Sequence, residues 1–87
     1  MILFAVGDAG PAKYLAYIMK VMCKDDYICI GSSISEKVFD EFNISYVKED
    51  KHILLDTVDI IVTGTCLDDC LDKKWIKLGK KNKVKTV

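Results

Sequence analysis

Two short turns contain the residue types that could bind a ligand. The first, Gly7-Asp8-Ala9-Gly10, follows an apolar run at residues 2–6, and the second, Thr63-Gly64-Thr65, follows an apolar run at residues 58–62. A glycine turn between a buried strand and a helix presents backbone N–H groups to an anion, and threonine hydroxyls add further hydrogen bonds. The predicted ligand-binding residues are therefore those of the two turns: Gly7, Asp8, Ala9, Gly10, Thr63, Gly64 and Thr65.

The same glycines have a purely structural alternative. The first turn lacks the third glycine of the dinucleotide fingerprint, and it also lacks the lysine and hydroxyl of the phosphate-binding loop in nucleotide hydrolases. Gly7 and Gly10 can serve only to turn the chain and to bring the following helix against a sheet. After the second turn, Asp68 and Asp69 suit the positive end of a helix dipole better than a phosphate site.

The cysteines and the histidine do not form a recognisable catalytic or metal site. Cys66 and Cys70 are four residues apart without a further Cys or His nearby, which fits neither a zinc site nor a redox Cys-x-x-Cys motif. Cys23 and Cys29 fit small buried hydrophobic residues, whereas Cys66 would be reactive if it were exposed at a helix N-terminus. His52 fits a solvated surface position. The sequence therefore predicts no catalytic residue, no metal ligand and no cofactor.

Strand and helix patterns alternate along the chain, and they position the two turns. Apolar runs and helical spacing predict strands at residues 2–6, 27–30, 44–47, 58–62 and 83–87, helices at 11–23, 35–42 and 67–80, and a helical turn or two between 52 and 57. Continuous apolar strands joined by amphipathic helices are typical of a parallel sheet covered on both faces. We expect one three-layer, Rossmann-like α/β domain over residues 1–87, with about five mostly parallel strands in the order 3-2-1-4-5. This order brings both turns to one crevice.

Helical spacing also predicts which side chains face the core, and where one helix begins. Ser33 or Ser35 could cap the second helix, and Glu36 lies three residues after Ser33, which fits a capping box. The side chains expected to face inward are Leu15, Ile18, Met19 and Met22 in the first helix, Val38, Phe39 and Phe42 in the second, and Leu67, Leu71 and Ile76, with Trp75 or Leu78, in the third.

The composition favours an ordinary globular domain. The chain has 13 basic and 13 acidic residues, so its formal net charge of zero gives no general argument for nucleic acid or an anionic membrane as a partner. The lysines between residues 73 and 85 are therefore interpreted as a solvated helix face. No apolar run approaches the roughly twenty residues that span a bilayer, and no secretory signal is recognisable, so we expect a cytoplasmic location with reduced cysteines.

Residues 2–15 run from a strand through the glycine turn into a helix, and residues 59–69 run from a strand into the Thr-Gly-Thr turn. Together they resemble the first domain of bacterial and archaeal two-domain glycosyltransferase-like proteins of surface-carbohydrate synthesis, a group similar to the non-hydrolysing sugar-nucleotide 2-epimerases. The intervening segments Ile30-Gly31-Ser32-Ser33, Val38-Phe39 and Asn43-Ile44 follow in the expected order.

In that class the first domain largely binds the acceptor, and the second holds most of the sugar nucleotide. The resemblance therefore implies that residues 1–87 correspond to part of an N-terminal domain and form a binding module that does not catalyse a reaction alone. Its expected ligand is a sugar phosphate, nucleotide or sugar nucleotide, in the crevice between residues 7–12 and 63–68. The alternative is an interaction module in which an exposed edge strand at residues 83–87 pairs with another chain to form a homo-oligomer.

Overall fold

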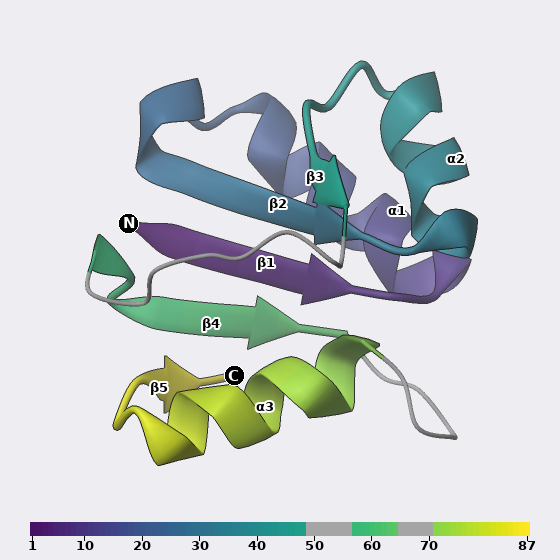
Figure 1. The fold of residues 1–87 in the computed structure, drawn as a ribbon. Helices are drawn as coiled ribbons and strands as arrows, with labels where there is room; N and C mark the ends of the chain where they lie inside the picture. Colours follow the sequence, from purple (N-terminus) through teal and green to yellow (C-terminus); the bar gives the residue numbers. More distant parts are fainter. Residues whose placement is uncertain (49–56, 65–70) are drawn as a thin grey trace.

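The computed structural model describes residues 1–48, 57–64 and 71–87. Within this part of the chain, a five-stranded sheet has the order β3-β2-β1-β4-β5, and all of its neighbouring strands are parallel (Figure 1). Its strands are β1 (Ile2–Val6), β2 (Tyr27–Gly31), β3 (Val47–Lys48), β4 (Ile60–Thr63) and β5 (Lys85–Thr86). The predicted α/β class, parallel sheet and strand order are confirmed.

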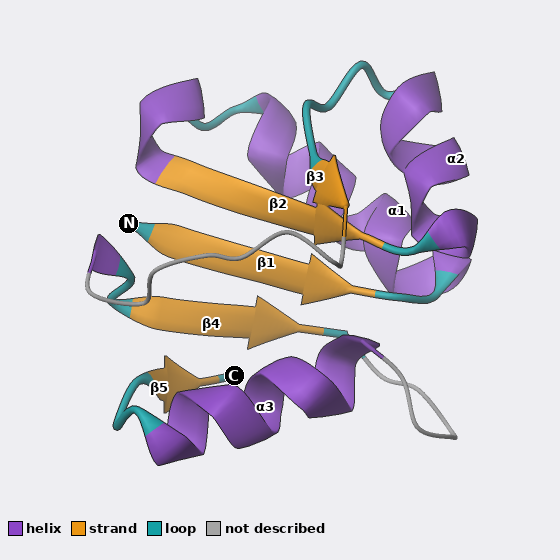
Figure 2. Ribbon diagram, viewed as in Figure 1, coloured by secondary structure: helices purple, strands orange, loops and turns teal. Residues whose placement is uncertain are grey.

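The helices cover both faces of the sheet and so form three layers (Figure 2). The helical elements are α1 (Ala9–Lys20), the short 3-10 helix η1 (Lys24–Asp26), α2 (Ser33–Glu41) and α3 (Leu71–Lys81). The chain moves from β1 through β2 to β3 on one side of β1, and from β4 to β5 on the other side. Because parallel crossovers are right-handed, these opposite directions place α1 and α2 on one face and α3 on the other.

Alternate side chains of β1 supply the two halves of the core. Phe4 and Val6 pack with α1 and α2, whereas Leu3 and Ala5 pack on the α3 side. Each of these four side chains is at most 3% exposed. A strand buried on both faces in this way explains the continuous apolar run that identified it in the sequence.

The buried face of α1 differs from the one that helical spacing predicted. Met19 is buried as expected, but Ile18 is 50% exposed, and the buried positions around Met19 are Ala12 and Ala16. Leu15 lies at the margin of the core. Two alanines on one face let the helix axis approach the sheet closely, so the helix turns its larger side chains toward the margins and the solvent.

Several predicted boundaries were wrong by a few residues. Helix α1 begins at Ala9 and ends at Lys20, where the backbone N–H groups of Val21 and Met22 donate to carbonyl groups three residues back and tighten the last turn. The strand predicted at residues 44–47 is replaced by the two-residue strand β3 (Val47–Lys48), because buried Ile44 belongs to the connection that follows α2. The last strand is likewise shorter than predicted. The described part of the third helix begins at Leu71, and its predicted start at residue 67 lies outside the described residues.

The N-cap of α2 is also one residue earlier than predicted, at Ser32 and not at Ser33. Ser32 is the N-cap, and its backbone N–H donates to the Ser35 hydroxyl oxygen at 2.9 Å. The Ser32 hydroxyl donates to the Gly7 carbonyl oxygen, also at 2.9 Å. The predicted pairing of Ser33 with Glu36 was therefore wrong, because Ser32 is required at the cap to bind the turn after β1.

Helices α2 and α3 end in the same left-handed motif. Asn43 and Lys83 have φ angles of 55° and 59°. In each case the next residue donates its N–H to a carbonyl oxygen five residues back, from Ile44 to Phe39 and from Val84 to Gly79, both at 2.8 Å. This is the Schellman pattern, in which glycine is the preferred residue at the left-handed position.

Replacing Lys83 with glycine should raise the free energy of unfolding by about 0.5–1 kcal/mol, because glycine adopts a positive φ without the steric cost that lysine bears. The measurement is urea-induced unfolding of the variant and the parent chain. As a control, Lys81→Gly lies within α3 and should lower the free energy of unfolding by about 1 kcal/mol. Equal effects of the two substitutions would contradict the assignment of Lys83 to the strained position.

Candidate ligand-binding site

The two predicted turns lie next to each other at the carboxyl edge of the sheet. Strands β1 and β4 are neighbours, with Ala5 paired to Thr63 in the parallel register. Gly7 therefore follows β1, and Gly64 follows β4, at the same edge. The structure brings together the residues that the sequence placed there, at the point where the connections leave the sheet toward opposite faces.

A buried carboxylate already binds the backbone of both turns. Asp72, in the first turn of α3, is 1% exposed. Its Oδ1 atom accepts the Gly7 N–H at 2.9 Å, and its Oδ2 atom accepts the Gly64 N–H at 2.7 Å. Bonds from backbone N–H groups to an ionised acceptor are stronger than those to a neutral acceptor. These two donors, which the sequence assigned to a ligand, thus bind an anion that belongs to the protein itself.

The role of Asp72 at this site was not predicted from the sequence, although the spacing of the residues in α3 contains a signal for its burial. Asp72, Trp75 and Gly79 are spaced as i, i+3 and i+7, and all three are buried in α3. A carboxylate on the inward face of a helix requires hydrogen-bond donors, and turns with free backbone N–H groups supply them. The inward position of Trp75, 4% exposed, agrees with the predicted core face.

Beside the two turns that Asp72 bridges, α1 and the end of β4 border a groove of about 560 Å³. Its volume lies within the range of small-molecule sites. The groove lies on the α1 side of the sheet, and its lining is mainly apolar, with the residues Gly10, Pro11, Tyr14, Leu15, Thr63, Gly64 and Val87. Three predicted site residues, Gly10, Thr63 and Gly64, are among them. Thr65 lies outside the described residues.

The polar groups near the groove are backbone donors and one hydroxyl. Asp8 is the N-cap of α1, but its side chain makes no capping hydrogen bond. The adjoining Ala9 and Gly10 are exposed, and N–H groups in the first turn of a helix have no intrahelical acceptor. The Thr63 hydroxyl and N–H both donate to the Val87 backbone oxygen, at 3.1 and 3.0 Å. The N-terminus of α1 is thus the open donor site at this edge.

Tyr14 is the aromatic side chain at the groove, and it is 79% exposed. Tyr17, one turn further along α1, instead packs its ring edge-on against Phe42, the C-cap residue of α2, with 5.0 Å between the centroids. The two tyrosines therefore differ in what they can do. Tyr14 leaves a ring face available to a ligand, whereas Tyr17 joins two helices.

The remaining chemistry-bearing residues form no further site in the described structure. Over residues 1–48, 57–64 and 71–87, no group of three His, Cys, Asp or Glu side chains is arranged to hold a metal ion. In the same ranges, no helix is long and apolar enough to cross a membrane. His52, Cys66 and Cys70, together with Asp68 and Asp69, lie outside the described residues.

The two described cysteines should differ strongly in reactivity. Burial raises the pKa of the Cys29 thiol to about 12, whereas Cys23 is exposed. Because only the thiolate is nucleophilic, iodoacetamide at about pH 8 should modify Cys23 and leave Cys29 unmodified until the protein unfolds. Peptide mapping by mass spectrometry measures both sites. Modification of Cys29 at the rate of Cys23 in the folded protein would contradict the buried position of β2.

Comparison with protein-family models, with curated proteins and with solved structures found no significant match to this chain. The geometry of the groove is therefore the basis on which a function is proposed.

Proposed function

We propose that this chain is a small-ligand binding module whose groove beside α1 holds a phosphorylated ligand with a ring, of the nucleotide or sugar-nucleotide class. The observation that carries the proposal is the groove of about 560 Å³ at the carboxyl ends of β1 and β4. Ligands of open parallel sheets bind at this edge, where the connections to the helices diverge.

The positions of the donors support one location for the phosphate. The Gly7 and Gly64 N–H groups already donate to Asp72, so a second anion there would face a carboxylate. The N–H groups of Ala9 and Gly10 are open, and they lie at the positive end of the α1 dipole. We therefore assign the phosphate to the first turn of α1.

The apolar lining supports a ring as the second part of the ligand. Tyr14 offers an exposed ring face, and Pro11, Leu15 and Val87 extend the apolar surface around it. Stacking of a base on an aromatic side chain contributes about 1–3 kcal/mol to binding. The resemblance to glycosyltransferase-like proteins agrees with the same class of ligand, and it remains a prediction.

The edge-strand alternative has less support from the geometry. Strand β5 is at the edge of the sheet as predicted, but it spans only Lys85–Thr86. The opposite edge, β3, is equally short and ends in Lys48. Short edge strands that carry lysine are typical of edges protected against pairing with another chain.

The experiment is an amide NMR titration of the chain with inorganic phosphate, uridine nucleotides and sugar nucleotides. The expected result is saturable shifts at Ala9, Gly10, Thr63 and Gly64, with nucleotides bound more tightly than phosphate because they also contact Tyr14. Absence of saturable shifts at these residues with every ligand at millimolar concentration would overturn the proposal.

Replacing Tyr14 with alanine should weaken nucleotide binding about tenfold, because the stacking surface is lost. Tyr17→Ala is the matched control, since it removes the same side chain from the same helix without altering the groove lining. Dissociation constants from the NMR titration measure both effects. Equal weakening by the two variants would show that the ring at position 14 is not the contact.

A further inference from the structure

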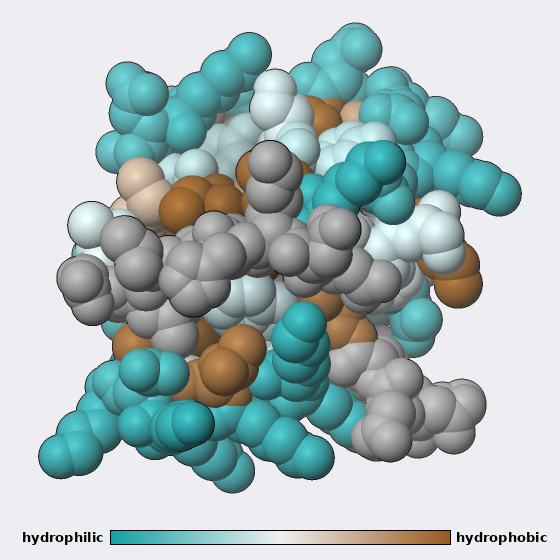
Figure 3. Space-filling view, viewed as in Figure 1, coloured by the Kyte–Doolittle hydropathy of each residue, from teal (hydrophilic) through white to brown (hydrophobic). Residues whose placement is uncertain are grey.

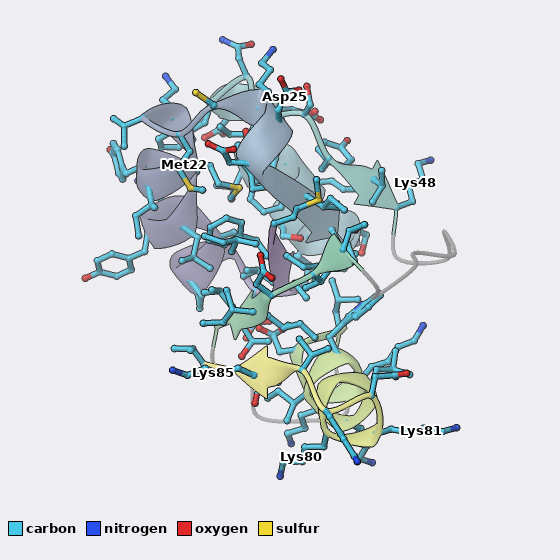
Figure 4. All side chains as sticks on the ribbon, turned by 90° about the vertical axis from the view of Figure 1, so that its left-hand side faces the viewer. Met22, Asp25, Lys48, Lys80, Lys81 and Lys85 are labelled. Carbon is cyan, nitrogen blue, oxygen red and sulfur yellow. The ribbon has the colours of Figure 1, made fainter. Side chains whose placement is uncertain are left out.

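The positive charges of this chain are concentrated at one end of the molecule. Residues 71–87 contain seven of the 13 lysines and a single acidic residue, Asp72, while the other 70 residues contain six lysines and twelve acidic residues. The net charge of zero is therefore the sum of a basic segment, residues 71–87, and an acidic remainder of the chain. In Figure 4, Asp25 lies at the end of the molecule opposite to Lys80 and Lys81.

Helix α3 presents its lysines to solvent on one face. Its exposed residues are Lys73, Lys74, Lys77, Lys80 and Lys81, while its buried residues are Leu71, Asp72, Trp75 and Gly79. At 100° per residue the five lysines fall within about 120° of the helix circumference. We call these five residues the lysine face. Figure 3 shows hydrophilic side chains projecting along the lower edge of the molecule, where Figure 1 places α3.

Helix α3 itself offers no exposed acidic side chain to this face. The one acidic side chain of α3, Asp72, is buried and receives the N–H groups of Gly7 and Gly64. Within the described residues, Lys74, Lys77 and Lys80 form no ion pair. Lysines in the last turn also stabilise the helix dipole, but this role applies to Lys80 and Lys81 and not to Lys74 and Lys77.

We propose that the lysine face of α3 binds the phosphate backbone of double-stranded nucleic acid without sequence specificity. Lysine side chains on a helix contact phosphates and release the counterions condensed on the duplex. The face spans about 12 Å from Lys73 to Lys81 at 1.5 Å per residue, which is long enough to follow several phosphates. This surface lies on α3 and is separate from the groove beside α1, so the inference does not depend on the proposed ligand.

The composition of the face favours nucleic acid over the other polyanions. Helices that bind a membrane surface insert an exposed apolar face, but Leu78 of α3 packs against the core and Ile76 is half-buried. Lysine is depleted in protein interfaces, which need buried apolar anchors. Trp75 is buried, so no aromatic ring of α3 is available to stack on unpaired bases. A duplex backbone requires none of these features.

The test is fluorescence anisotropy with a labelled duplex of about 20 base pairs, from about 50 to about 200 mM salt. Four phosphate contacts, one each from Lys74, Lys77, Lys80 and Lys81, predict a slope of log K against log salt of about −3.6, and random-sequence duplexes should bind equally. The variant Lys74→Gln, Lys77→Gln, Lys81→Gln should bind at least about tenfold more weakly at the lower salt concentration, with a slope reduced by about 2–3.

The matched control is Lys13→Gln, Lys24→Gln, Lys37→Gln, which removes the same charge from exposed lysines elsewhere. It should change affinity by less than about threefold, because those lysines lie outside the lysine face. Equal weakening by both triple variants would overturn the proposal in favour of a general charge effect. No binding at the lower salt concentration, or tighter binding to anionic lipid vesicles than to the duplex, would also overturn it. Circular dichroism of each variant establishes that the fold is retained.

Discussion

Replacing Asp72 with alanine is expected to lower the free energy of unfolding by about 3 kcal/mol or more, the largest effect we expect from a single side chain in this protein. The Asp72 carboxylate receives the N–H groups of both turns, at 2.9 Å from Gly7 and 2.7 Å from Gly64. Its removal leaves two donors without their acceptor, one buried at Gly7 and one partly buried at Gly64. An unsatisfied buried donor costs about 1–3 kcal/mol, and a small cavity adds to this cost.

The substitution Asp72→Asn removes the negative charge and keeps the shape of the side chain, so it measures the contribution of the charge by itself. The asparagine side chain keeps one oxygen as an acceptor, but its amide group faces the second N–H donor to donor. We expect a loss in the free energy of unfolding of about 2 kcal/mol, smaller than for alanine.

Urea-induced unfolding measures both Asp72 variants. The control is Asp59→Ala, because Asp59 is 85% exposed and pairs only with the chain's amino terminus in the described structure. An exposed pair of this kind contributes about 0–1 kcal/mol. If the Asp72 variants were no less stable than Asp59→Ala, the bridge between the two turns would have to be abandoned.

The second large effect should come from Gly64→Ala, which is expected to lower the free energy of unfolding by about 3 kcal/mol. A Cβ atom at Gly64 would overlap the Pro11 ring, lying 2.9 Å from its Cγ and closer still to its Cβ. The proline ring is rigid, so it cannot move aside as a long side chain would. Relief of the overlap requires α1 to move away from β4, and this movement would also reshape the groove.

Gly10→Ala, in the same groove, should have the opposite effect on the free energy of unfolding. A Cβ atom at Gly10 meets no atom within 4 Å, and Gly10 lies within α1. Alanine in the helix should therefore raise the free energy of unfolding by up to about 1 kcal/mol. Thermal and urea unfolding of both variants test the pair, and a Gly64→Ala protein as stable as the parent would refute the close approach of Pro11 to the second turn.

The sequence by itself determined the class of fold, because its signals are local. The runs Ile2–Val6 and Tyr27–Gly31 are apolar without alternation, which is the pattern of strands buried on both faces. Right-handed crossovers then restrict the order of parallel strands to few arrangements. These two facts also placed the turns at Gly7 and Gly64 beside each other, so the position of the crevice could be predicted.

Other features depend on neighbours that are distant along the chain. The rotation of α1 that buries Ala12 and exposes Ile18 is set by how closely the helix approaches the sheet, which periodicity does not report. The cap of α2 moved to Ser32 because that hydroxyl bonds the Gly7 carbonyl, 25 residues earlier. In both cases the choice between adjacent residues was made by a tertiary contact.

The chemistry of the crevice was decided in the same way. From the sequence, the Gly7 and Gly64 N–H groups are free donors that invite a ligand anion, and Asp72 is one of several charged residues at a helix start. Only folding brings the Asp72 carboxylate within 2.9 Å of both donors, across 65 residues in one case. The sequence thus determined where two strands end together. The tertiary structure decided which acceptor their backbone meets, because a buried carboxylate must find its donors wherever the packing of the sheet provides them.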